Sequence, residues 1–266
     1  MQDCAYHRPG NLADAVSLRR GGGGSAYLAG GMTLIPTMKQ GLAQPDALVD
    51  LAGLNELVGC RLESGALVIG AMTRHAAVAQ SSVVEGAIPA LAALAGQIGD
   101  RQVRNRGTLG GSLANSDPAA DYPAAVIGLG ATIRTDRREI AADDYFKGLF
   151  ETALDEGELI REVAFPIPAR AAYRKFPHPA SRFAIVGVFV ADFGSGRVRV
   201  GVTGAGPCAF RPVSIEQALA ARLDPAALGG VAIDSSQFNS DLAASAAFRA
   251  QLVRVMAKRA VQDLLS

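Results

Sequence analysis

The chain has 266 residues, with 26 basic and 25 acidic side chains and an apolar fraction of 49%. A chain of this length can bury a substantial core without disulfides, as one large domain or as two to three small ones. The near-neutral charge, with no basic stripe and no charged tail, argues against a nucleic-acid partner and against attraction to a membrane surface.

Cysteine usage and hydropathy indicate a cytoplasmic protein. Cys4, Cys60 and Cys208 are far apart, which argues against a disulfide framework and favours a reducing compartment. No CxxC motif or His/Cys cluster is present, so we expect no metal site on this chain. The first ten residues lack the apolar core of a signal peptide, and the apolar run 184–191 is far shorter than the roughly 20 residues of a spanning helix. We therefore expect no membrane insertion.

The first half of the chain predicts alternating strands and helices. Asn11 is placed to cap a helix that stops at the glycine run 21–24. Ser64–Gly65 has the composition of a hairpin turn between alternating apolar segments. The expected segments are a helix at 12–20, a strand at 26–29, a helix at 32–40, a strand at 47–51, a hairpin at 59–71 and two helical pieces within 73–98, broken near Gly86 and Pro89.

The second half contains a glycine-rich stretch and then changes character. Residues 104–125 carry glycines and small polar side chains, and we interpret this stretch as a loop whose backbone approaches a ligand. The remaining expected segments are a buried helix at 123–131, a hairpin at 132–142, a strand at 157–168, antiparallel strands within 173–206 and helices at 214–223 and 241–265. The pattern predicts an α+β fold with a small βαβ unit at 1–53, a mixed sheet with helices at 54–168 and an antiparallel sheet with helices at 173–266.

A first candidate site is "LAGGMTL" at 28–34, where a strand runs into Gly30–Gly31 and then into a helix-like segment. Glycine has no Cβ, so backbone amides can face a ligand, and a phosphate there would also meet a helix N-terminus. Thr33 adds a hydroxyl. An ordinary tight turn is the alternative, because a Gly-Gly pair alone is a weak signal.

A second candidate site is "GTLGGSLANSDPAAD" at 107–121. Its glycines allow close approach, its hydroxyls and amide offer hydrogen bonds, and Asp121 offers an acceptor for a ribose hydroxyl. The spacing is neither GxGxxG nor the GxxxxGK[ST] of a P-loop, which argues against a nucleotide triphosphatase. A purely structural loop is the alternative. Two such loops in one chain suit the two phosphates of a dinucleotide.

The chain resembles the FAD-binding medium subunit of the molybdenum hydroxylases, the family of xanthine dehydrogenase and carbon monoxide dehydrogenase. That family carries an "AGGxxL" loop and an "RNxGTxGGNLAxxxPxxD" loop, which appear here as "AGGMTL" and "RNRGTLGGSLANSDPAAD". The segments "YHRPGNLADAV", "VIGAMTRHAAV", "DYFKGLFETALDEGELIREVAFPIP", "KFPHPASRFAIVGV" and "GVTGAGPCAFRPV" match in order along nearly the whole chain. The resemblance implies a two-part PCMH-type FAD-binding fold, with FAD between the first two parts and the third part covering the flavin side.

The resemblance also implies which residues bind FAD. Asp121 is expected at the ribose or adenine end, Ile160 on the adenine side and Lys175 near the flavin or its phosphates. Each has an alternative: Asp121 as a helix N-cap, Ile160 as plain core and Lys175 as a solvated strand residue. The full expected set is Ala29, Gly30, Gly31, Met32, Thr33, Leu34, Thr108, Gly110, Gly111, Ser112, Asn115, Asp121, Ile160 and Lys175.

Three positions depart from the family pattern. Met32 stands where Thr or His is usual, so only its backbone can contact the cofactor, and Ser112 replaces Asn with a shorter polar reach. His178 precedes a proline where basic residues are common. We expect structural roles for His7, His75 and His178. Arg101, Arg104 and Arg106 are expected either to attract flavin phosphates, to form an ion-paired interface or to be plain surface.

The implied function is electron transfer within a larger enzyme. Electrons from [2Fe–2S] clusters on a partner chain would pass through FAD to an external acceptor, so no catalytic residue is expected here. The implied partners are an iron–sulfur small subunit and a molybdopterin large subunit, in an (αβγ)₂ assembly. Two alternatives remain: a self-sufficient FAD oxidase or reductase, and a degenerate nucleotide-binding or assembly module without a redox role.

Overall fold

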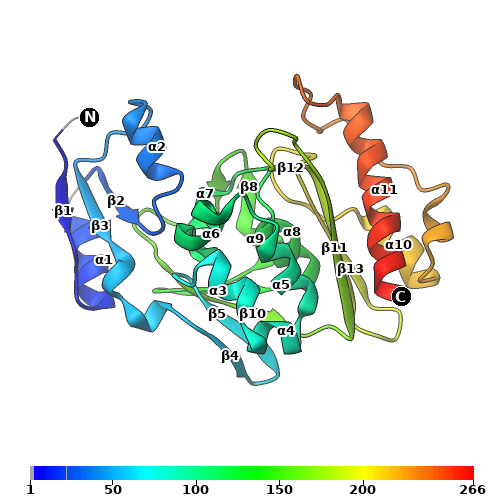
Figure 1. Ribbon diagram of the computed structural model, residues 1–266, viewed down its shortest axis with the longest axis horizontal. Coiled ribbons are helices and arrows are strands. Elements are labelled where there is room, and N and C mark those ends of the chain that lie inside the picture. Colours follow the sequence, from blue (N-terminus) through cyan, green and yellow to red (C-terminus); the bar gives the residue numbers. More distant parts are fainter. Residues whose placement is uncertain (1–2, 22) are drawn as a thin grey trace.

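The computed structural model describes residues 3–21 and 23–266, arranged as three larger sheets that follow one another along the long axis (Figure 1). The N-terminal unit is a parallel sheet of order β1-β3-β2. Its elements are β1 (Ala5–His7), α1 (Leu12–Gly21), β2 (Ser25–Leu28), α2 (Leu34–Lys39), β3 (Ala47–Asp50) and the short helices η1 (Leu51–Gly53) and η2 (Asn55–Leu57). Asn11 accepts a hydrogen bond from the Asp14 amide at 2.9 Å, which confirms the predicted start of α1.

The central sheet has the strand order β4-β5-β10-β6-β7, and its pairings are antiparallel where the sequence suggested a mixed sheet. Its strands are β4 (Cys60–Glu63), β5 (Ala66–Gly70), β6 (Thr132–Thr135), β7 (Glu139–Ala141) and β10 (Ile160–Pro166). Ser64 and Gly65 form the β4–β5 turn with φ of 51° and 78°, as predicted. Beside this sheet lie α9 (Ala142–Tyr145) and the small hairpin of β8 (Phe146–Gly148) and β9 (Glu151–Thr152).

Two expectations for the helices of this region are wrong. Residues 73–98 form three helices rather than two, because the Ser81 hydroxyl accepts from the Val84 amide and starts a new helix. The stretch 104–125 is mostly helical rather than a loop. Asp100 caps the helix at 101–106, and Thr108 caps the next helix, which contains Gly110 and Gly111. The helices are α3 (His75–Gln80), α4 (Ser82–Ala87), α5 (Pro89–Gly96), α6 (Arg101–Arg106), α7 (Leu109–Asn115) and α8 (Tyr122–Leu129).

The C-terminal part is an antiparallel sheet between helices, as predicted. The sheet consists of β11 (Arg170–Pro177), β12 (Ala184–Asp192) and β13 (Val198–Thr203), followed by α10 (Val213–Ala221), η3 (Pro225–Leu228) and α11 (Ala246–Leu265). α8 packs on one face of this sheet and α11 on the other, so every residue of β12 is buried. No helix in the described ranges, α11 included, is long and apolar enough to cross a membrane.

Gly201 on β13 marks the tightest contact between α8 and the C-terminal sheet. A Cβ at Gly201 would lie 2.0 Å from the Ala124 carbonyl oxygen and 2.7 Å from the Gly128 amide nitrogen, both backbone atoms that cannot turn away. We therefore expect Gly201→Ala to lower the free energy of unfolding by about 3 kcal/mol, at the upper end of overpacking costs. Urea denaturation measures this, with Gly230→Ala as control because Gly230 has open space around it. A loss below about 1 kcal/mol at Gly201 would contradict the packing.

Candidate functional site

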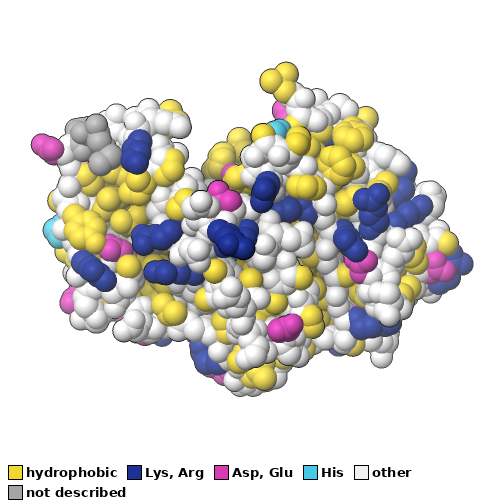
Figure 2. Space-filling model, in the orientation of Figure 1, with side chains coloured by type: hydrophobic (Ala, Val, Ile, Leu, Met, Phe, Trp, Pro, Cys, Tyr) yellow, Lys and Arg dark blue, Asp and Glu magenta, His cyan; other side chains and the backbone are white. Residues whose placement is uncertain are grey.

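A cleft of about 700 Å³ lies between the N-terminal unit, the helices around α6 and α7, and the loop that joins β11 to β12. The molecule is visibly hollowed beside the N-terminal unit, which forms the left lobe of Figure 2. The cleft brings together the sequence-predicted residues Ala29, Gly30, Gly31, Met32, Thr33, Leu34, Thr108, Gly110, Gly111, Ser112, Asn115, Asp121 and Ile160. Lys175 is the predicted residue that is absent from this lining.

The two glycine segments pack directly against each other. A Cβ at Gly30 would lie 2.2 Å from the Arg106 carbonyl oxygen and 2.7 Å from the Cα of Gly107. A Cβ at Gly111 would lie 3.4 Å from the side chain of Ala29. The segments are far apart in sequence, and these contacts place them in one continuous wall of the cleft.

The first glycine segment offers backbone donors. Gly31 has a φ of +72°, a conformation that favours glycine, and turns the chain from β2 toward α2. Thr33 occupies the N-cap position of α2, but its hydroxyl makes no capping hydrogen bond. The first amides of a helix have no partner within the helix. In α2 the Ile35 amide donates to the Gly31 carbonyl at 3.2 Å, and Pro36 has no amide hydrogen. The amides of Thr33 and Leu34, which have no hydrogen-bond partner among the described residues, are available to a ligand in the cleft.

The second glycine segment offers side chains rather than backbone amides. The Gly110 amide donates to the Ala71 carbonyl at 2.8 Å, and the Gly111 amide donates to the Thr108 hydroxyl at 3.1 Å. By contrast, the Ser112 hydroxyl and the Asn115 amide have no hydrogen-bond partner among the described residues, and both residues line the cleft. The two segments are therefore not equivalent, although their glycine content made them look alike in the sequence.

Asp121 lies at the start of α8 but does not act as its cap. Its carboxylate makes no capping bond, so the alternative that Asp121 serves as a helix N-cap is wrong. It instead accepts a hydrogen bond of 2.5 Å from the Tyr173 hydroxyl and lies 2.9 Å from the Lys175 ammonium. Burial raises the pKa of the Asp121 carboxyl, while Lys175 and Tyr173 act in the opposite direction.

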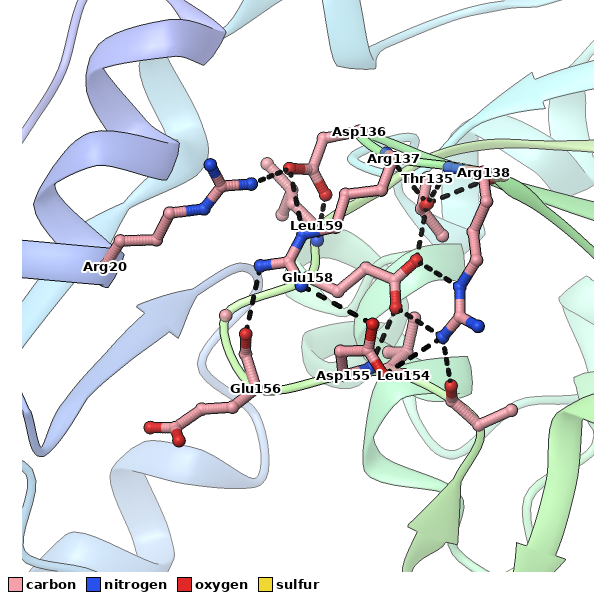
Figure 3. A network of polar contacts seen from close by, with 12 residues as sticks. Arg20, Thr135, Asp136, Arg137, Arg138, Leu154, Asp155, Glu156, Glu158 and Leu159 are labelled. Atoms are coloured by element: carbon pink, nitrogen blue, oxygen red, sulfur yellow. Dashed lines mark hydrogen bonds and ion pairs between the residues drawn. The ribbon is translucent and has the colours of Figure 1, made fainter.

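The segment from Leu154 to Ile160 forms another wall of the cleft, and Glu158 holds it in place (Figure 3). The buried Glu158 carboxylate accepts hydrogen bonds from the Thr135 hydroxyl at 2.7 Å, from the Arg138 guanidinium at 2.9 and 3.0 Å, and from the Asp155 amide at 2.8 Å. Burial alone would raise the pKa of Glu158, but these donors overcome it and lower the pKa to about 2. Glu158 is therefore ionised at neutral pH.

The same network joins this wall to the N-terminal unit. Asp136 accepts from the Leu159 amide at 2.8 Å and pairs with Arg20 of α1 at 3.2 Å (Figure 3). The Tyr27 hydroxyl of β2 donates to the Gly157 carbonyl at 3.2 Å. Polar contacts thus fix the distance between the first glycine segment and the wall that contains Ile160.

The loop after β11 covers the opposite end of the cleft. Ala180, Ser181, Arg182 and Phe183 line the cleft, and His178 organises this loop. Its Nδ1 accepts hydrogen bonds from the amides of Ala180 and Ser181 at 3.2 and 3.3 Å. The structural role expected for His178 therefore has a specific form, which is to hold the turn that brings Phe183 to the cleft.

Sequence reasoning treated His75 as structural, but this residue also lines the cleft. It is 5% exposed, its Nδ1 has no hydrogen-bond partner in the part of the chain that the structure describes, and its ring lies 5.3 Å from that of Tyr122. Burial, with a smaller contribution from Arg104, lowers the pKa of His75 to about 4. The ring is therefore neutral at neutral pH. A lone histidine in an apolar segment gives no sequence signal for this position.

The three arginines before the second glycine segment lie on α6 beside the cleft and do not line it. Arg104 donates to the carbonyls of Ile98 and Gly99 at 2.9 and 3.1 Å, which fixes a turn that does line the cleft. Arg101 and Arg106 are exposed. The placement of these three arginines therefore does not support the expectation that they attract a phosphate in the cleft.

The groups in this cleft fit a dinucleotide. Its lining is mostly apolar, and the Thr33 and Leu34 amides and the free Ser112 and Asn115 side chains can meet phosphates. A side chain at Gly30 would intrude on the opposing segment. Fold and cleft together define an α+β protein that binds a dinucleotide cofactor between two chain segments.

Comparisons with known proteins identify the family. The model of the FAD binding domain in molybdopterin dehydrogenase matches residues 2–168. The glyceraldehyde dehydrogenase medium chain of Sulfolobus acidocaldarius is 31% identical, with 98% of each chain covered. The carbon monoxide dehydrogenase medium chain of Afipia carboxidovorans is 35% identical over 97% of this chain and 95% of that one. The solved CO dehydrogenase of Oligotropha carboxidovorans has a TM-score of 0.89 at 33% identity, with 99% of this chain and 98% of that chain covered.

The chain belongs to the FAD-binding medium subunits of the molybdenum hydroxylases, and it is therefore the FAD subunit of an oxidoreductase.

Proposed function

We propose that this chain carries electrons from [2Fe–2S] clusters on a partner chain, through FAD, to an external acceptor. The observation that carries the proposal is the packing of two glycine segments into one wall of a cleft, with free amides on one segment and free polar side chains on the other. The medium-chain relatives, matched over nearly their full length, support the same role.

Different residues of the cleft would contact different parts of FAD. The amides at the start of α2 and the Ser112 and Asn115 side chains would bind the pyrophosphate, and the glycines let it lie against the backbone. Ile160 would pack on the adenine, beside the wall that Glu158 holds. FAD, once bound, supplies the redox chemistry, and the protein supplies position, polarity and exclusion of water. We assign no catalytic residue to this chain.

The contacts of Asp121 favour a different end of FAD from the one suggested by the sequence. Asp121 is bonded to Tyr173 and Lys175 of β11, next to the loop that contains Phe183, whereas Ile160 follows the segment tied to the N-terminal unit. We propose that Asp121 faces the flavin end and not the adenine end. Contact of Asp121 with the ribose or adenine end, as the sequence suggested, stays the alternative prediction.

We further propose three parts at 1–53, 54–168 and 173–266, with FAD between the first two and the third covering the flavin side. The first two parts contain the N-terminal and central sheets, whereas β11 of the C-terminal sheet begins at Arg170, just before the proposed boundary. The proposed partners are an iron–sulfur small subunit and a molybdopterin large subunit in an (αβγ)₂ assembly in the cytoplasm. The relatives named as medium chains of dehydrogenases support the existence of such partners. The partner that holds the molybdenum would select the substrate.

A visible absorbance spectrum tests the cofactor directly. We expect the purified chain to bind FAD at near one equivalent and Gly111→Val to lose it, because a side chain there meets the Thr108 hydroxyl at 2.9 Å and Ala29 at 3.4 Å. Gly230→Val, in open surroundings, is the matched control. Absence of flavin from the wild-type chain, with and without its partners, would overturn the proposal. Turnover by the isolated chain would instead favour a self-sufficient oxidase.

A further inference from the structure

A buried ion pair lies behind the cleft, between β11 and the start of α8. The Lys175 ammonium lies 2.9 Å from one carboxylate oxygen of Asp121 and 3.2 Å from the other. Both side chains are only 4% exposed. Tyr173, which is two residues before Lys175 on the same face of the strand, donates to the same carboxylate. The C-terminal sheet thus binds Asp121 through two side chains.

Lys175 also fixes a second part of the cleft wall. Its ammonium donates to the carbonyl of Gln97 at 2.9 Å, at the end of α5. The next residues, 98–100, line the cleft, and the Arg104 guanidinium donates to the carbonyls of Ile98 and Gly99. Lys175 therefore contacts two segments of the lining without belonging to it.

A charge pair in this position is stable only as a unit. A buried ion without its partner is costly, because neither water nor another charge compensates it. Asp121 has a partner on each of its oxygens, and the lysine has donors directed to both Asp121 and Gln97. Loss of the ammonium would leave the Asp121 carboxylate as an unpaired charge facing the cofactor cleft.

We infer that Lys175 is a positioning residue, which acts on the cofactor through Asp121 and the turn after Gln97 and does not itself touch FAD. This inference rests on the proposed function, since it takes FAD as the ligand of the cleft. It differs from the sequence expectation, in which Lys175 approaches the flavin or its phosphates. The difference between direct contact and action through Asp121 is measurable.

A double-mutant cycle on the full-length chain separates the two roles. FAD affinity is measured by flavin fluorescence for the wild type, Lys175→Met, Asp121→Asn and the Asp121→Asn/Lys175→Met double variant. We expect Lys175→Met to weaken FAD binding about tenfold or more in the wild-type background. In the Asp121→Asn background, where no carboxylate is left unpaired, the same change should cost less than about threefold. The visible circular dichroism of bound FAD should change with Lys175→Met and not between Asp121→Asn and the double variant.

An equal loss on removing Lys175 in both backgrounds would overturn the inference and establish direct contact with FAD. If Lys175→Met fails to fold, the comparison of Asp121→Asn with the double variant still decides, because neither contains an unpaired buried carboxylate. Failure of the wild-type chain to bind FAD would instead count against the proposed function. The two failures are therefore distinguishable.

Discussion

Replacement of Gly30 by alanine is expected to weaken FAD binding severely. The added Cβ would lie 2.2 Å from the Arg106 carbonyl oxygen and 2.7 Å from the Cα of Gly107, so the two glycine segments must separate. Because the donors at the start of α2 and the side chains of α7 then no longer face one ligand, we expect affinity to fall by about a thousandfold. Titration with FAD measures the loss.

Gly10→Ala is a suitable control, because nothing lies within 4 Å of its added Cβ and its φ is ordinary. Thermal unfolding of the apo chain separates loss of the site from loss of the fold. Retained FAD affinity in a folded Gly30→Ala protein would show that the two segments can move apart without cost to the site. The N-terminal unit, which contains α2, would then be able to shift relative to α7 in the central part (Figure 1).

Replacement of Glu158 by alanine is expected to have the largest effect on stability in the cleft wall. It removes the acceptor of Thr135, Arg138 and the Asp155 amide at once and leaves these donors without their partner. Such a loss costs about 3 kcal/mol in the free energy of unfolding. Urea denaturation at neutral pH measures this value, and FAD affinity should fall with it because Ile160 follows directly. Glu156→Ala, on an exposed side chain of the same segment, is the control.

Because the pKa of Glu158 is lowered in the folded chain, the free energy of unfolding should depend on pH with a predictable sign. Its pKa is about 2 in the folded chain, against an ordinary value of 4.5. The carboxylate therefore contributes its full stability above about pH 4.5, and this contribution is lost as pH falls toward 2. Glu158→Gln should lack this component, so the difference in unfolding free energy between wild type and variant should shrink from pH 6 to pH 3. A difference that is constant over this range would contradict the assigned network.

Regular segments could be predicted well from the sequence because their signals are local. The β4–β5 turn at Ser64–Gly65, the cap at Asn11 and the apolar strand β12 each follow from residues within a short window. β1 could not be predicted in this way, since its three residues are exposed and only their pairing with β3 makes them a strand. The helix α7 could not be predicted from its sequence, because its glycines have low helix propensity. The close packing of Gly110 against Ala71 and the Thr108 cap outweigh that propensity in the folded chain.

Long-range contacts explain what was missed in the cleft. Glu158 is unremarkable in the sequence, and only its bonds to Thr135 and Arg138 of the neighbouring hairpin make it a wall residue. Asp121 before an apolar run looks like an N-cap, yet β11 provides it with stronger partners. The glycine motifs, in contrast, were visible because close backbone approach demands a particular residue type wherever it occurs.

The sequence positions of the segments that form the cleft determine when, during synthesis, the protein can first bind FAD. The lining runs from Ala26 to Phe183, and Asp121 depends on a lysine at position 175. The ribosome releases a chain from its N-terminus at about 5–20 residues per second. A nascent chain that has emerged only as far as residue 168, the end of the region that the family model matches, still lacks the loop at one end of the cleft. It also lacks Lys175, the partner of the buried Asp121 carboxylate. We therefore expect stable FAD binding only late in synthesis, and truncated chains released from the ribosome should lack flavin absorbance.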